Sequence, residues 1–327
     1  MESKTLEFIA TKYDANARLD VVITKRIKHL TRSNLKKIIE LKKVKVNNDI
    51  VILPSKKVKL NEQITVDFEN NSPIKIEASN IKLNILYEDK DICVVNKPAG
   101  MVVHPGAGNY ENTLVNALMF KYKKNLSSIN GNLRPGIVHR IDKETSGILV
   151  VAKNNLAHSK ISDQFSKHTI KRKYLALVWG VVRPLNGKIE TLISRNKKNR
   201  QLMSVSEFNG KKAITNYRTV KVFDIKNVPK ISLLECELET GRTHQIRVHF
   251  SYKKNPLLGD KQYGKKNIKF KKVDKNFEKK LNLLNGQALH AKSLGFVHPT
   301  SAKFVSFETN IPHDYKKLLD LLIKLSG

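Results

Sequence analysis

The chain has 327 residues, enough for two or three domains that each bury a core, and its 40% hydrophobic residues with only 15 Gly and 10 Pro exclude a disordered chain. Its 61 Lys and Arg against 29 Asp and Glu leave a net charge of +32, which suits a polyanion such as nucleic acid. Codon drift in an AT-rich genome would also supply lysine, which makes up 49 of these cations. The charge is therefore compatible with a nucleic-acid partner, and the sequence motifs must show whether the protein has one.

The cysteines and the N-terminus indicate the compartment. Cys93 and Cys236 lie in apolar, strand-like runs without the paired spacing of a zinc site, which predicts two buried thiols in a reducing environment. The first residues, "MESKTLEFIA", carry charge where a signal peptide is apolar, and no apolar run approaches transmembrane length. We therefore expect a cytoplasmic protein without a membrane span.

The first periodic segments lie near the N-terminus. Residues 18–27 repeat apolar side chains at helical spacing, and a second helix is expected after the candidate caps Thr31 and Ser33. The strand "VKVNN" follows, and residues 64–68 alternate as in a half-buried strand. The polar sides of the two helices carry Lys25, Arg26, Arg32, Lys36, Lys37, Lys42 and Lys43.

This helix pair resembles the S4 RNA-binding module over residues 16–66. The resemblance rests on "ARLDVVI", "LTRSNLKKII" and "VKVNN". One position departs from it, because Lys42 stands where S4 modules usually carry glycine. The resemblance implies a small S4-like α/β RNA-binding domain over residues 1–75. Its expected RNA contacts are Arg18, Arg32, Lys36 and Lys37.

A larger α+β domain is expected over residues 76–327. The polar, aperiodic stretch at residues 69–80 contains Pro73 and is interpreted as a linker. Short strands then dominate, and many follow one another without an intervening helix, which favours a mixed, mainly antiparallel sheet over a doubly wound parallel one. Within this domain, residues 253–280 are Lys-rich and weakly periodic, which predicts an exposed basic insertion.

One acid stands among basic residues in "RPGIVHRIDKETSGILVVAKN", residues 134–154. Asp142 follows His139 and Arg140 and precedes a turn of small residues. Such a stretch is often a surface turn with a local ion pair. The alternative is a carboxylate that neighbouring cations keep ionised at the mouth of a cleft, where it can act as a nucleophile.

Two further polar segments follow strand-like or basic runs. The Gly- and Pro-rich loop at residues 96–109 carries Lys97 and His104, and it lacks the glycine spacing of a phosphate-binding P-loop. The segment "KRKYLALVWG" places Tyr174 at the start of a strand, behind three cations. Taken alone, a tyrosine at a strand end is usually a packing residue.

The segment "LETGRTHQIRVHF", residues 238–250, is rich in polar side chains. Thr243 is a candidate helix cap, and a helix that begins there turns Ile246 and Phe250 to the core. Arg247 then projects towards a neighbouring loop. On its own, a basic helix face is usually solvated.

Taken in order, "HRIDKETSGILVVAKN", "KYLALVWG", "LETGRTHQIRVHF" and "LLGDKQYG…QALHAKSLGFVHP" resemble the RluA-type pseudouridine synthases. The resemblance covers nearly the whole chain. The loop "NKPAGMVVHPGAGN", the following "TLVNAL" and the S4-like N-terminus narrow it to members that modify large-subunit ribosomal RNA. It implies the pseudouridine synthase fold. It also implies that Asp142 is the catalytic residue, that Tyr174 is the active-site tyrosine and that Arg247 is the basic partner of Asp142.

The reaction of that family suits these residues. Uracil is released from its C1′–N1 bond, turned and rejoined through C5 without redox change, and we expect neither a cofactor nor a metal. One carboxylate can act as the nucleophile or stabilise positive charge at C1′. A charge-assisted pair with Arg247 would keep Asp142 ionised and aimed, while Tyr174 stacks on the uracil and helps with the C5 proton. A stacked uridine must leave its stem, and Arg140 is the expected wedge.

The resemblance also implies the partner. We expect a monomer that acts on a hairpin loop of 23S ribosomal RNA or its large-subunit precursor, with Arg140 and Arg242 among the RNA contacts and no membrane partner. Within this resemblance, neither the exact uridines nor the point of attack, C1′ or C6, is specified.

Two alternative functions stay open. The first is a non-catalytic S4-type RNA-binding or ribosome assembly protein, although such a protein has no need to keep the three catalytic residue types together. The second is a metal-dependent nuclease or hydrolase that uses His139, His244 and His249. The spacing of the last two is off the i, i+4 register of paired helical ligands, and no acidic cluster lies nearby in the sequence.

Overall fold

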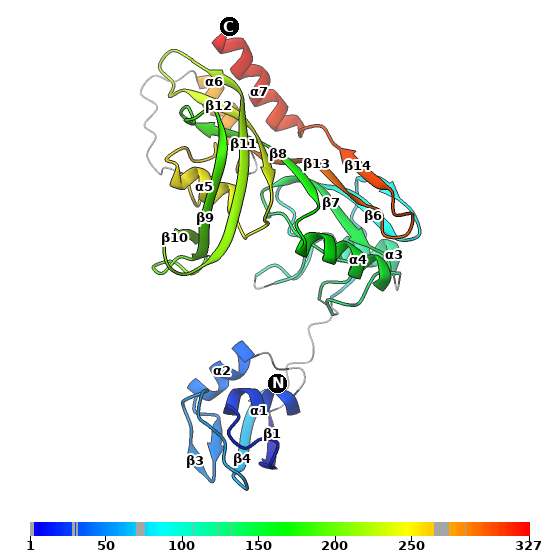
Figure 1. Cartoon of the computed structure of the whole chain (residues 1–327), viewed down its shortest axis with the longest axis vertical. Coiled ribbons are helices and arrows are strands. Elements are labelled where there is room, and N and C mark those ends of the chain that lie inside the picture. Colours follow the sequence, from blue (N-terminus) through cyan, green and yellow to red (C-terminus); the bar gives the residue numbers. More distant parts are fainter. Residues whose placement is uncertain are drawn as a thin grey trace. The chain divides into compact units, whose positions relative to one another are not determined.

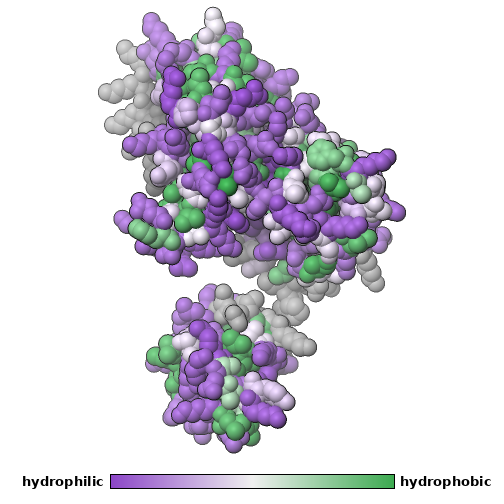
Figure 2. Space-filling model, viewed as in Figure 1, coloured by the Kyte–Doolittle hydropathy of each residue, from purple (hydrophilic) through white to green (hydrophobic). Residues whose placement is uncertain are grey.

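The computed structural model describes residues 3–27, 30, 32–69, 76–106, 108–123, 125–131, 133–264, 275–284 and 286–327. The chain divides into two compact units, residues 1–75 and 76–327, called here the small unit and the large unit (Figure 1). Hydrophilic residues cover most of the visible face of each unit (Figure 2). No described helix is both long and apolar enough to cross a membrane.

The small unit packs two helices on an antiparallel sheet. Its elements are β1 (Ser3–Ile9), α1 (Leu19–Arg26), α2 (Arg32–Glu40), β2 (Val44–Val46), β3 (Asp49–Ile50) and β4 (Gln63–Glu69), and the strands lie in the order β1-β4-β2-β3. The expected helices and strands are present. Their apolar faces are buried in one core that includes Leu19, Ile23, Leu35, Ile39, Ile64 and Val66.

The turn after α2 has an unusual backbone. Lys42, which stands where S4 modules usually carry glycine, has a φ of +63°. This left-handed conformation is the one that glycine adopts most easily. Lys42 therefore adopts the conformation that a glycine would take without strain, at the cost that a side chain brings to it.

The large unit is built on one mixed, mainly antiparallel sheet, as the sequence predicted. Its strands are β5 (Ile85–Glu88), β6 (Ile92–Lys97), β7 (Ser146–Ala152), β8 (Lys171–Trp179), β9 (Asn186–Arg195), β10 (Met203–Ser206), β11 (Lys211–Phe223), β12 (Ile231–Leu238), β13 (Leu289–Val297) and β14 (Phe304–Glu308). The order is β10-β9-β11-β12-β8-β13-β7-β6-β5, with β14 on β13. Among the described strands, β13 and β7 form the parallel pair, and the other pairs are antiparallel.

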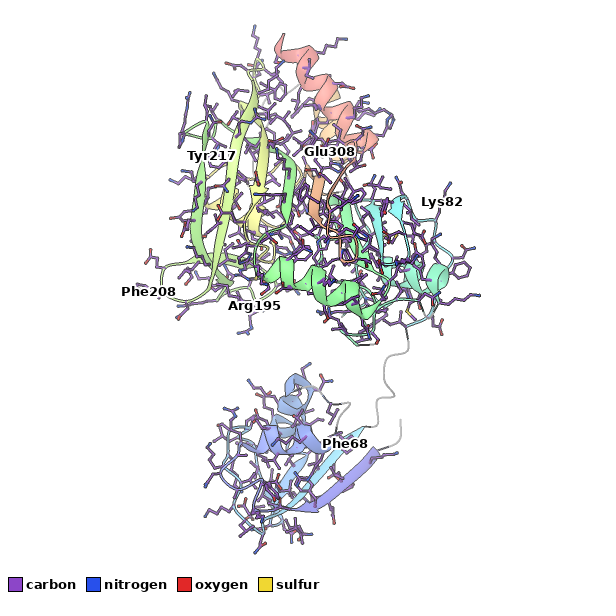
Figure 3. All side chains as sticks on the ribbon, turned by 45° about the vertical axis from the view of Figure 1, so that its right-hand side comes forward. Phe68, Lys82, Arg195, Phe208, Tyr217 and Glu308 are labelled. Carbon is purple, nitrogen blue, oxygen red and sulfur yellow. The ribbon has the colours of Figure 1, made fainter. Side chains whose placement is uncertain are left out.

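Helices lie against both halves of this sheet. They are α3 (Leu114–Tyr122), α4 (Asn155–Ser166), α5 (Gln245–Tyr252), α6 (Lys275–Asn282) and α7 (His313–Ser326). Helix α4 packs on β7 and β13, and α5 on β10 and β11 (Figure 1). Tyr217 of β11 (Figure 3) meets Phe250 of α5 edge to face at 5.6 Å between ring centres. This contact anchors the helix that also carries Arg247.

Strand β13 joins the two halves of the sheet. It lies between β8 and β7, and its parallel pairing with β7 is limited to His290 with Ser146 and Ala291 with Gly147. Gly147 has a φ of +118°, and a Cβ at this position would collide with the Ala291 backbone. Glycine is therefore needed where the loop that carries Asp142 enters β7.

The interpretation of residues 69–80 as a linker is wrong at both ends. Glu69 is the last residue of β4, and Ile76 is 7% exposed in the main core of the large unit. Asn116 Nδ2 donates to the Glu77 carbonyl at 2.7 Å, which holds this segment on the start of α3. Polar composition hid these anchors, because one buried isoleucine is too little periodicity to detect. Residues 70–75 lie outside the described residues.

The prediction of an exposed basic insertion at residues 253–280 is wrong in part: described lysines such as Lys253, Lys254 and Lys261 are exposed, but the segment is anchored in the core. Leu257 and Leu258 are buried, Asp260 is 6% exposed, and Phe277 of α6 is fully buried beside Trp179. The lysines of this stretch outnumber these buried residues, so the apolar positions could not be recognised from composition. Residues 265–274 lie outside the described residues.

Candidate active site

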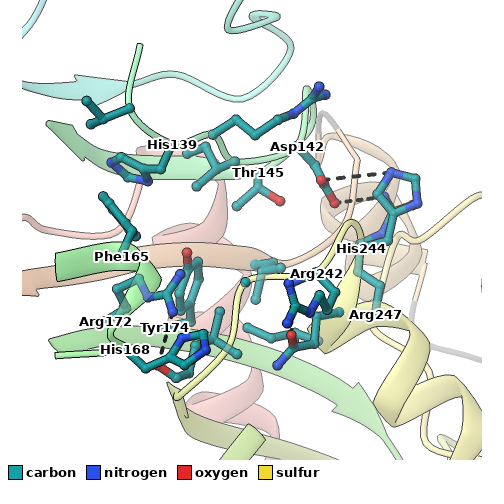
Figure 4. Close-up of a pocket in the computed structure, with 18 residues that line it drawn as sticks. His139, Asp142, Thr145, Phe165, His168, Arg172, Tyr174, Arg242, His244 and Arg247 are labelled. Carbon is teal, nitrogen blue, oxygen red and sulfur yellow. Dashed lines mark hydrogen bonds and ion pairs between the residues drawn. The ribbon is translucent and has the colours of Figure 1, made fainter. Parts of the chain in front are cut away.

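A cavity of about 290 Å³ opens in the large unit. Its walls come from residues 138–145 ahead of β7, from α4, from β8, and from residues 238–247, which run from the end of β12 into the first turn of α5. The three residues predicted to be catalytic, Asp142, Tyr174 and Arg247, all line it, as does the predicted RNA contact Arg242 (Figure 4). The predicted RNA contact Arg140 also belongs to the lining.

Asp142 meets Arg247 in this cavity, as predicted. Asp142 Oδ2 accepts a hydrogen bond from Arg247 Nη1 at 3.0 Å, across 105 residues of chain (Figure 4). Asp142 Oδ1 lies 3.8 Å from Nε2 of His244. The Asp142 side chain is 18% exposed, so it is bound on one side and open to the cavity on the other. A charge-assisted bond of this kind fixes the orientation of the carboxylate.

A buried lysine holds the loop next to Asp142. Lys97 ends β6 and is fully buried, and its Nζ donates to the carbonyl oxygens of Pro98, Met101 and Lys143 at 2.7, 2.8 and 3.0 Å. Burial lowers the pKa of Lys97 to about 7, and the nearby negative charge of Asp142 opposes this shift. In the sequence, Lys97 was noted only as a lysine in a loop that lacks the glycine spacing of a phosphate-binding P-loop. Its bond to the residue after Asp142 shows that it positions the acid's loop.

Arg247 is shared between two carboxylates. Its Nε and Nη2 donate to Oδ2 and Oδ1 of Asp260 at 2.7 and 2.9 Å, and Nη2 also donates to Gln262 Oε1 at 2.8 Å. The side chains of Arg247 and Asp260 are 5% and 0% exposed. Burial alone would lower the pKa of Arg247, but the bonds and charges of Asp260 and Asp142 outweigh it and raise that pKa.

Asp260 was missed from the sequence because it falls in the stretch predicted to be exposed. Burial would raise the pKa of Asp260, but the bonds from Arg247 outweigh that effect and lower it. Backbone N–H groups of Gln262 and Tyr263 also donate to Asp260 Oδ1 at 3.0 Å each. The signal that could have found it is the string "LLGDKQYG", where two leucines and a glycine precede the acid.

Tyr174 lies on β8 and is 8% exposed. In the sheet it pairs with Cys236 of β12 and Ala291 of β13, so both neighbouring strands fix its position. Burial raises the pKa of Tyr174, and the charge of Asp142 adds to this while Arg172 opposes it. The phenol is therefore neutral at neutral pH, with its ring at the wall of the cavity.

The start of α5 differs from the prediction. Thr243 is not the helix cap, because His244 occupies that position with a φ of +56° and makes no capping hydrogen bond with its side chain. Gln245 Oε1 instead accepts from the Arg242 backbone N–H at 2.9 Å and from Thr240 Oγ1 at 2.8 Å. The buried glutamine thus holds the turn before the helix, and the N-cap residue itself contributes no side-chain cap. The other predictions for α5 are confirmed, because Ile246 and Phe250 are buried.

The three histidines proposed as metal ligands serve other partners. His139 Nε2 accepts from the Val150 backbone at 3.1 Å, His249 lies between Thr191 and Thr215, and His244 Nδ1 bonds to the Tyr263 hydroxyl at 2.8 Å. Burial lowers the pKa of His139 to about 3 and that of His249 to about 4. Within the described ranges, the group whose ligand atoms lie close enough to hold a metal is Asp89, Asp91 and His298, away from this cavity. The donor set of the cavity does not fit the metal hypothesis.

The predicted RNA contacts of the small unit that the structure describes, Arg18, Lys36 and Lys37, lie on its surface. Arg18 forms a two-pronged ion pair with Asp20 at 3.0 and 2.9 Å, and its side chain is still 49% exposed. Lys36 and Lys37 of α2 are exposed, and Lys36 lies 3.5 Å from Glu40. Arg32 begins α2, and its side chain lies outside the described part of the structure.

Comparisons with known proteins identify the family. The RNA pseudouridylate synthase family model matches residues 91–252, and the S4 domain model matches residues 17–64. A protein of Zymomonas mobilis named ribosomal large subunit pseudouridine synthase D is 45% identical over 94% of each chain. The chain belongs to the RNA pseudouridylate synthase family.

Further relatives agree with this pseudouridylate synthase assignment. An uncharacterized RNA pseudouridine synthase of Bacillus subtilis is 41% identical over 98% of each chain. The solved structure of human RNA pseudouridylate synthase domain containing 1 superposes with a TM-score of 0.56 at 25% identity, covering 72% of this chain and 86% of that one. The resemblance drawn from the sequence motifs is therefore confirmed, and the large unit has the pseudouridine synthase fold.

Proposed function

We propose that this protein is an RNA pseudouridine synthase that converts specific uridines in a hairpin loop of 23S ribosomal RNA to pseudouridine. The observation that carries the proposal is the Asp142 carboxylate, which Arg247 fixes at 3.0 Å beside Tyr174 in an open cavity. Relatives named ribosomal large subunit pseudouridine synthase D support the choice of RNA.

In this proposal Asp142 acts on the target nucleotide. Its carboxylate attacks C1′ or C6, and either route lets the C1′–N1 bond break while the uracil stays in the cavity. The base turns, C5 bonds to C1′, and N1 gains a proton in place of the one that C5 loses. Atoms and electrons balance without an oxidant, a reductant or a second substrate. Arg247 stabilises the carboxylate whenever Asp142 is released from the nucleotide.

Tyr174 supplies the surface on which the uracil rests. Its backbone is paired with both neighbouring strands, so the position of the residue is fixed while the base turns. Burial raises its pKa, so the phenol is neutral and is a poor acceptor for the C5 proton; in this proposal it stacks on the base and, contrary to the sequence-based expectation, does not take the proton. If the attack falls on C1′, formation of the C1′–C5 bond frees Asp142, which is then the acceptor that this cavity offers beside the tyrosine.

Arg140 and the small unit provide access to the uridine. Arg140 is exposed at the cavity, two residues before Asp142, where it can fill the gap that an extruded uridine leaves in the stem. Lys36 and Lys37 present charge to the RNA backbone and supply affinity without base specificity. Arg242 adds a further cation at the cavity, and its Nε is held by the Lys212 carbonyl at 2.9 Å.

The test is to map pseudouridines in ribosomal RNA from cells that lack this protein. Wild-type protein should restore the missing sites, and Asp142→Asn should not, while its affinity for the RNA stays nearly unchanged. Glu144→Gln is the matched control, because it removes the other carboxylate of the same loop without touching the cavity lining. If Asp142→Asn retains activity within about tenfold of wild type, Asp142 is not the catalytic residue; if no site is missing in the depleted cells, the non-catalytic alternative returns.

A further inference from the structure

Arg172 is a buried cation of the cavity that the proposed chemistry does not use. It lies on β8 two residues before Tyr174, and because side chains alternate along a strand, both reach the same face and line the cavity (Figure 4). The residue is only 7% exposed. Nothing in the family reaction outlined above assigns it a role.

The guanidinium of Arg172 lacks a counter-charge. Its Nη2 lies 3.4 and 3.3 Å from the carbonyl oxygens of Leu238 and Glu239, and Nε has no hydrogen-bond partner. Throughout the described residues, no carboxylate lies within ion-pair distance of it. Arg247, the other buried arginine of the cavity, has two. A buried charge that meets only neutral acceptors is unfavourable until an anion arrives.

The fold makes room for this guanidinium. A Cβ on Gly241 would lie 2.6 Å from Arg172 Nη1, so any other residue at that position would displace the arginine. On the other side, Arg172 Cζ lies 5.4 Å from the centre of the Phe165 ring. The arginine thus lies between a glycine and an aromatic ring. Its guanidinium is therefore held in a defined position, unlike that of a solvent-exposed side chain.

The groups around Arg172 add no negative charge. Burial lowers its pKa, and the neighbouring cation Arg242 lowers it further while Tyr174 opposes the shift. His139, whose own pKa falls through burial and the nearness of Arg172, is neutral at neutral pH. A uracil oxygen is also neutral and would leave the charge uncompensated. A phosphate carries a full charge and accepts two bonds from the guanidinium fork.

We propose that Arg172 binds a phosphate group adjacent to the target uridine and so sets how deep the nucleotide enters the cavity. This inference rests on the proposed function, because it takes RNA as the occupant of the cavity. Arg172 is a positioning residue here, while Asp142 carries out the chemistry.

The experiment uses synthetic RNA hairpins that contain a mapped target uridine. One hairpin has natural phosphates, and in two others a single phosphate, 5′ or 3′ of the uridine, is replaced by an uncharged methylphosphonate. Dissociation constants are measured in the full-length Asp142→Asn background, so that no turnover interferes. The variants are Arg172→Gln, Arg172→Lys and, as the matched control, Lys171→Gln. Lys171 is the preceding residue of β8, is exposed and pairs loosely with Glu237 at 3.7 Å.

We expect Arg172→Gln to weaken binding of the natural hairpin about 10- to 100-fold, the range for a charge-assisted hydrogen bond. One of the two methylphosphonate hairpins should bind the protein with an intact Arg172 more weakly by a similar factor. On that same hairpin, Arg172→Gln should weaken binding little further. Lys171→Gln should change all three dissociation constants by less than about threefold.

Two results would overturn the inference. Equal weakening of all three hairpins by Arg172→Gln would mean that no single phosphate is its partner. Full affinity of Arg172→Gln for the natural hairpin would mean that the arginine does not meet the RNA. If Arg172→Gln fails to fold, Arg172→Lys, which keeps the charge, takes its place. Arg172→Lys must then bind the natural hairpin more weakly than the protein with an intact Arg172 does, and this difference must disappear on one of the methylphosphonate hairpins. Wild-type protein is assayed for pseudouridine on the natural hairpin in parallel, so a failure of the proposed function is seen separately.

Discussion

Arg247 bonds both Asp142 and Asp260, so its contribution to stability can be separated from its proposed part in catalysis. Arg247→Met keeps the length of the side chain but leaves Asp142 and Asp260 without the guanidinium that joins them. Because the Arg247 and Asp260 side chains are 5% and 0% exposed, water cannot replace it. Removing one partner of such a buried pair costs about 3–5 kcal/mol. We expect a decrease in stability of that size, together with the disappearance of pseudouridine formation.

A second change should restore stability without restoring activity. Adding Asp260→Asn to Arg247→Met removes the charge that has no partner, so the double variant should be more stable than the sum of the two single effects predicts, by about 2 kcal/mol or more. Activity should stay absent, because Asp142 still lacks its anchor. Arg247→Lys should also be inactive, since an ammonium group cannot make both the fork to Asp260 and the bond to Asp142.

The assay uses the single tryptophan of the chain. Trp179 is 7% exposed in β8, so its fluorescence during urea unfolding reports on the large unit. Single-turnover pseudouridine formation is measured on the same samples. Arg218→Met is the control, because Arg218 is 64% exposed and its pair with Glu235 at 3.4 Å should contribute less than about 1 kcal/mol. Changes in stability that add within about 0.5 kcal/mol, or an active Arg247→Met enzyme, would refute the shared-carboxylate reasoning.

Two further predictions concern the rest of the chain. Removing residues 1–75 should weaken binding to structured ribosomal RNA and reduce its salt slope by about one for each phosphate that the small unit neutralises, with the Trp179 transition unchanged; an unchanged slope would show that the small unit does not touch RNA. Lys97 has a folded pKa of about 7 against an ordinary 10.5, so between these pH values the unfolded chain binds more protons and stability rises with pH. The stability advantage of wild type over Lys97→Met should therefore grow by roughly 3 kcal/mol from pH 7 to 9.5, and a constant difference in urea unfolding would show that Lys97 is not held at a lowered pKa.

The strongest sequence signals were local strings. The acid in "HRIDKETSG" and the arginine in "TGRTHQIRVH" were found because each string is specific, and the structure brings Asp142 and Arg247 together as expected. The mainly antiparallel sheet was also predictable, since strands follow one another without helices between them. Patterns of this kind are set by neighbours in the chain.

The roles that the sequence did not reveal depend on contacts between residues far apart in the chain. Asp260 and Lys97 are both buried, and a carboxylate or an ammonium group is expected at the surface unless its partner is known. The partner of Asp260 is 13 residues away, and Lys97 is bound to a carbonyl 46 residues away. Thr243 failed as a cap because the helix begins one residue later, after His244 in a left-handed conformation. Composition cannot reveal such pairings.

The place of β13 in the sheet has a consequence for synthesis of the chain. Asp142 belongs to the half of the sheet that contains β7, and Tyr174 and Arg247 to the half that contains β8 and β12, while the strand between the halves, Leu289–Val297, is made late. A nascent chain that ends before residue 289 has both halves but no strand to join them. The cavity is therefore completed only when the segment from residue 289 onward leaves the ribosome, and ribosomes that stall earlier release no working enzyme.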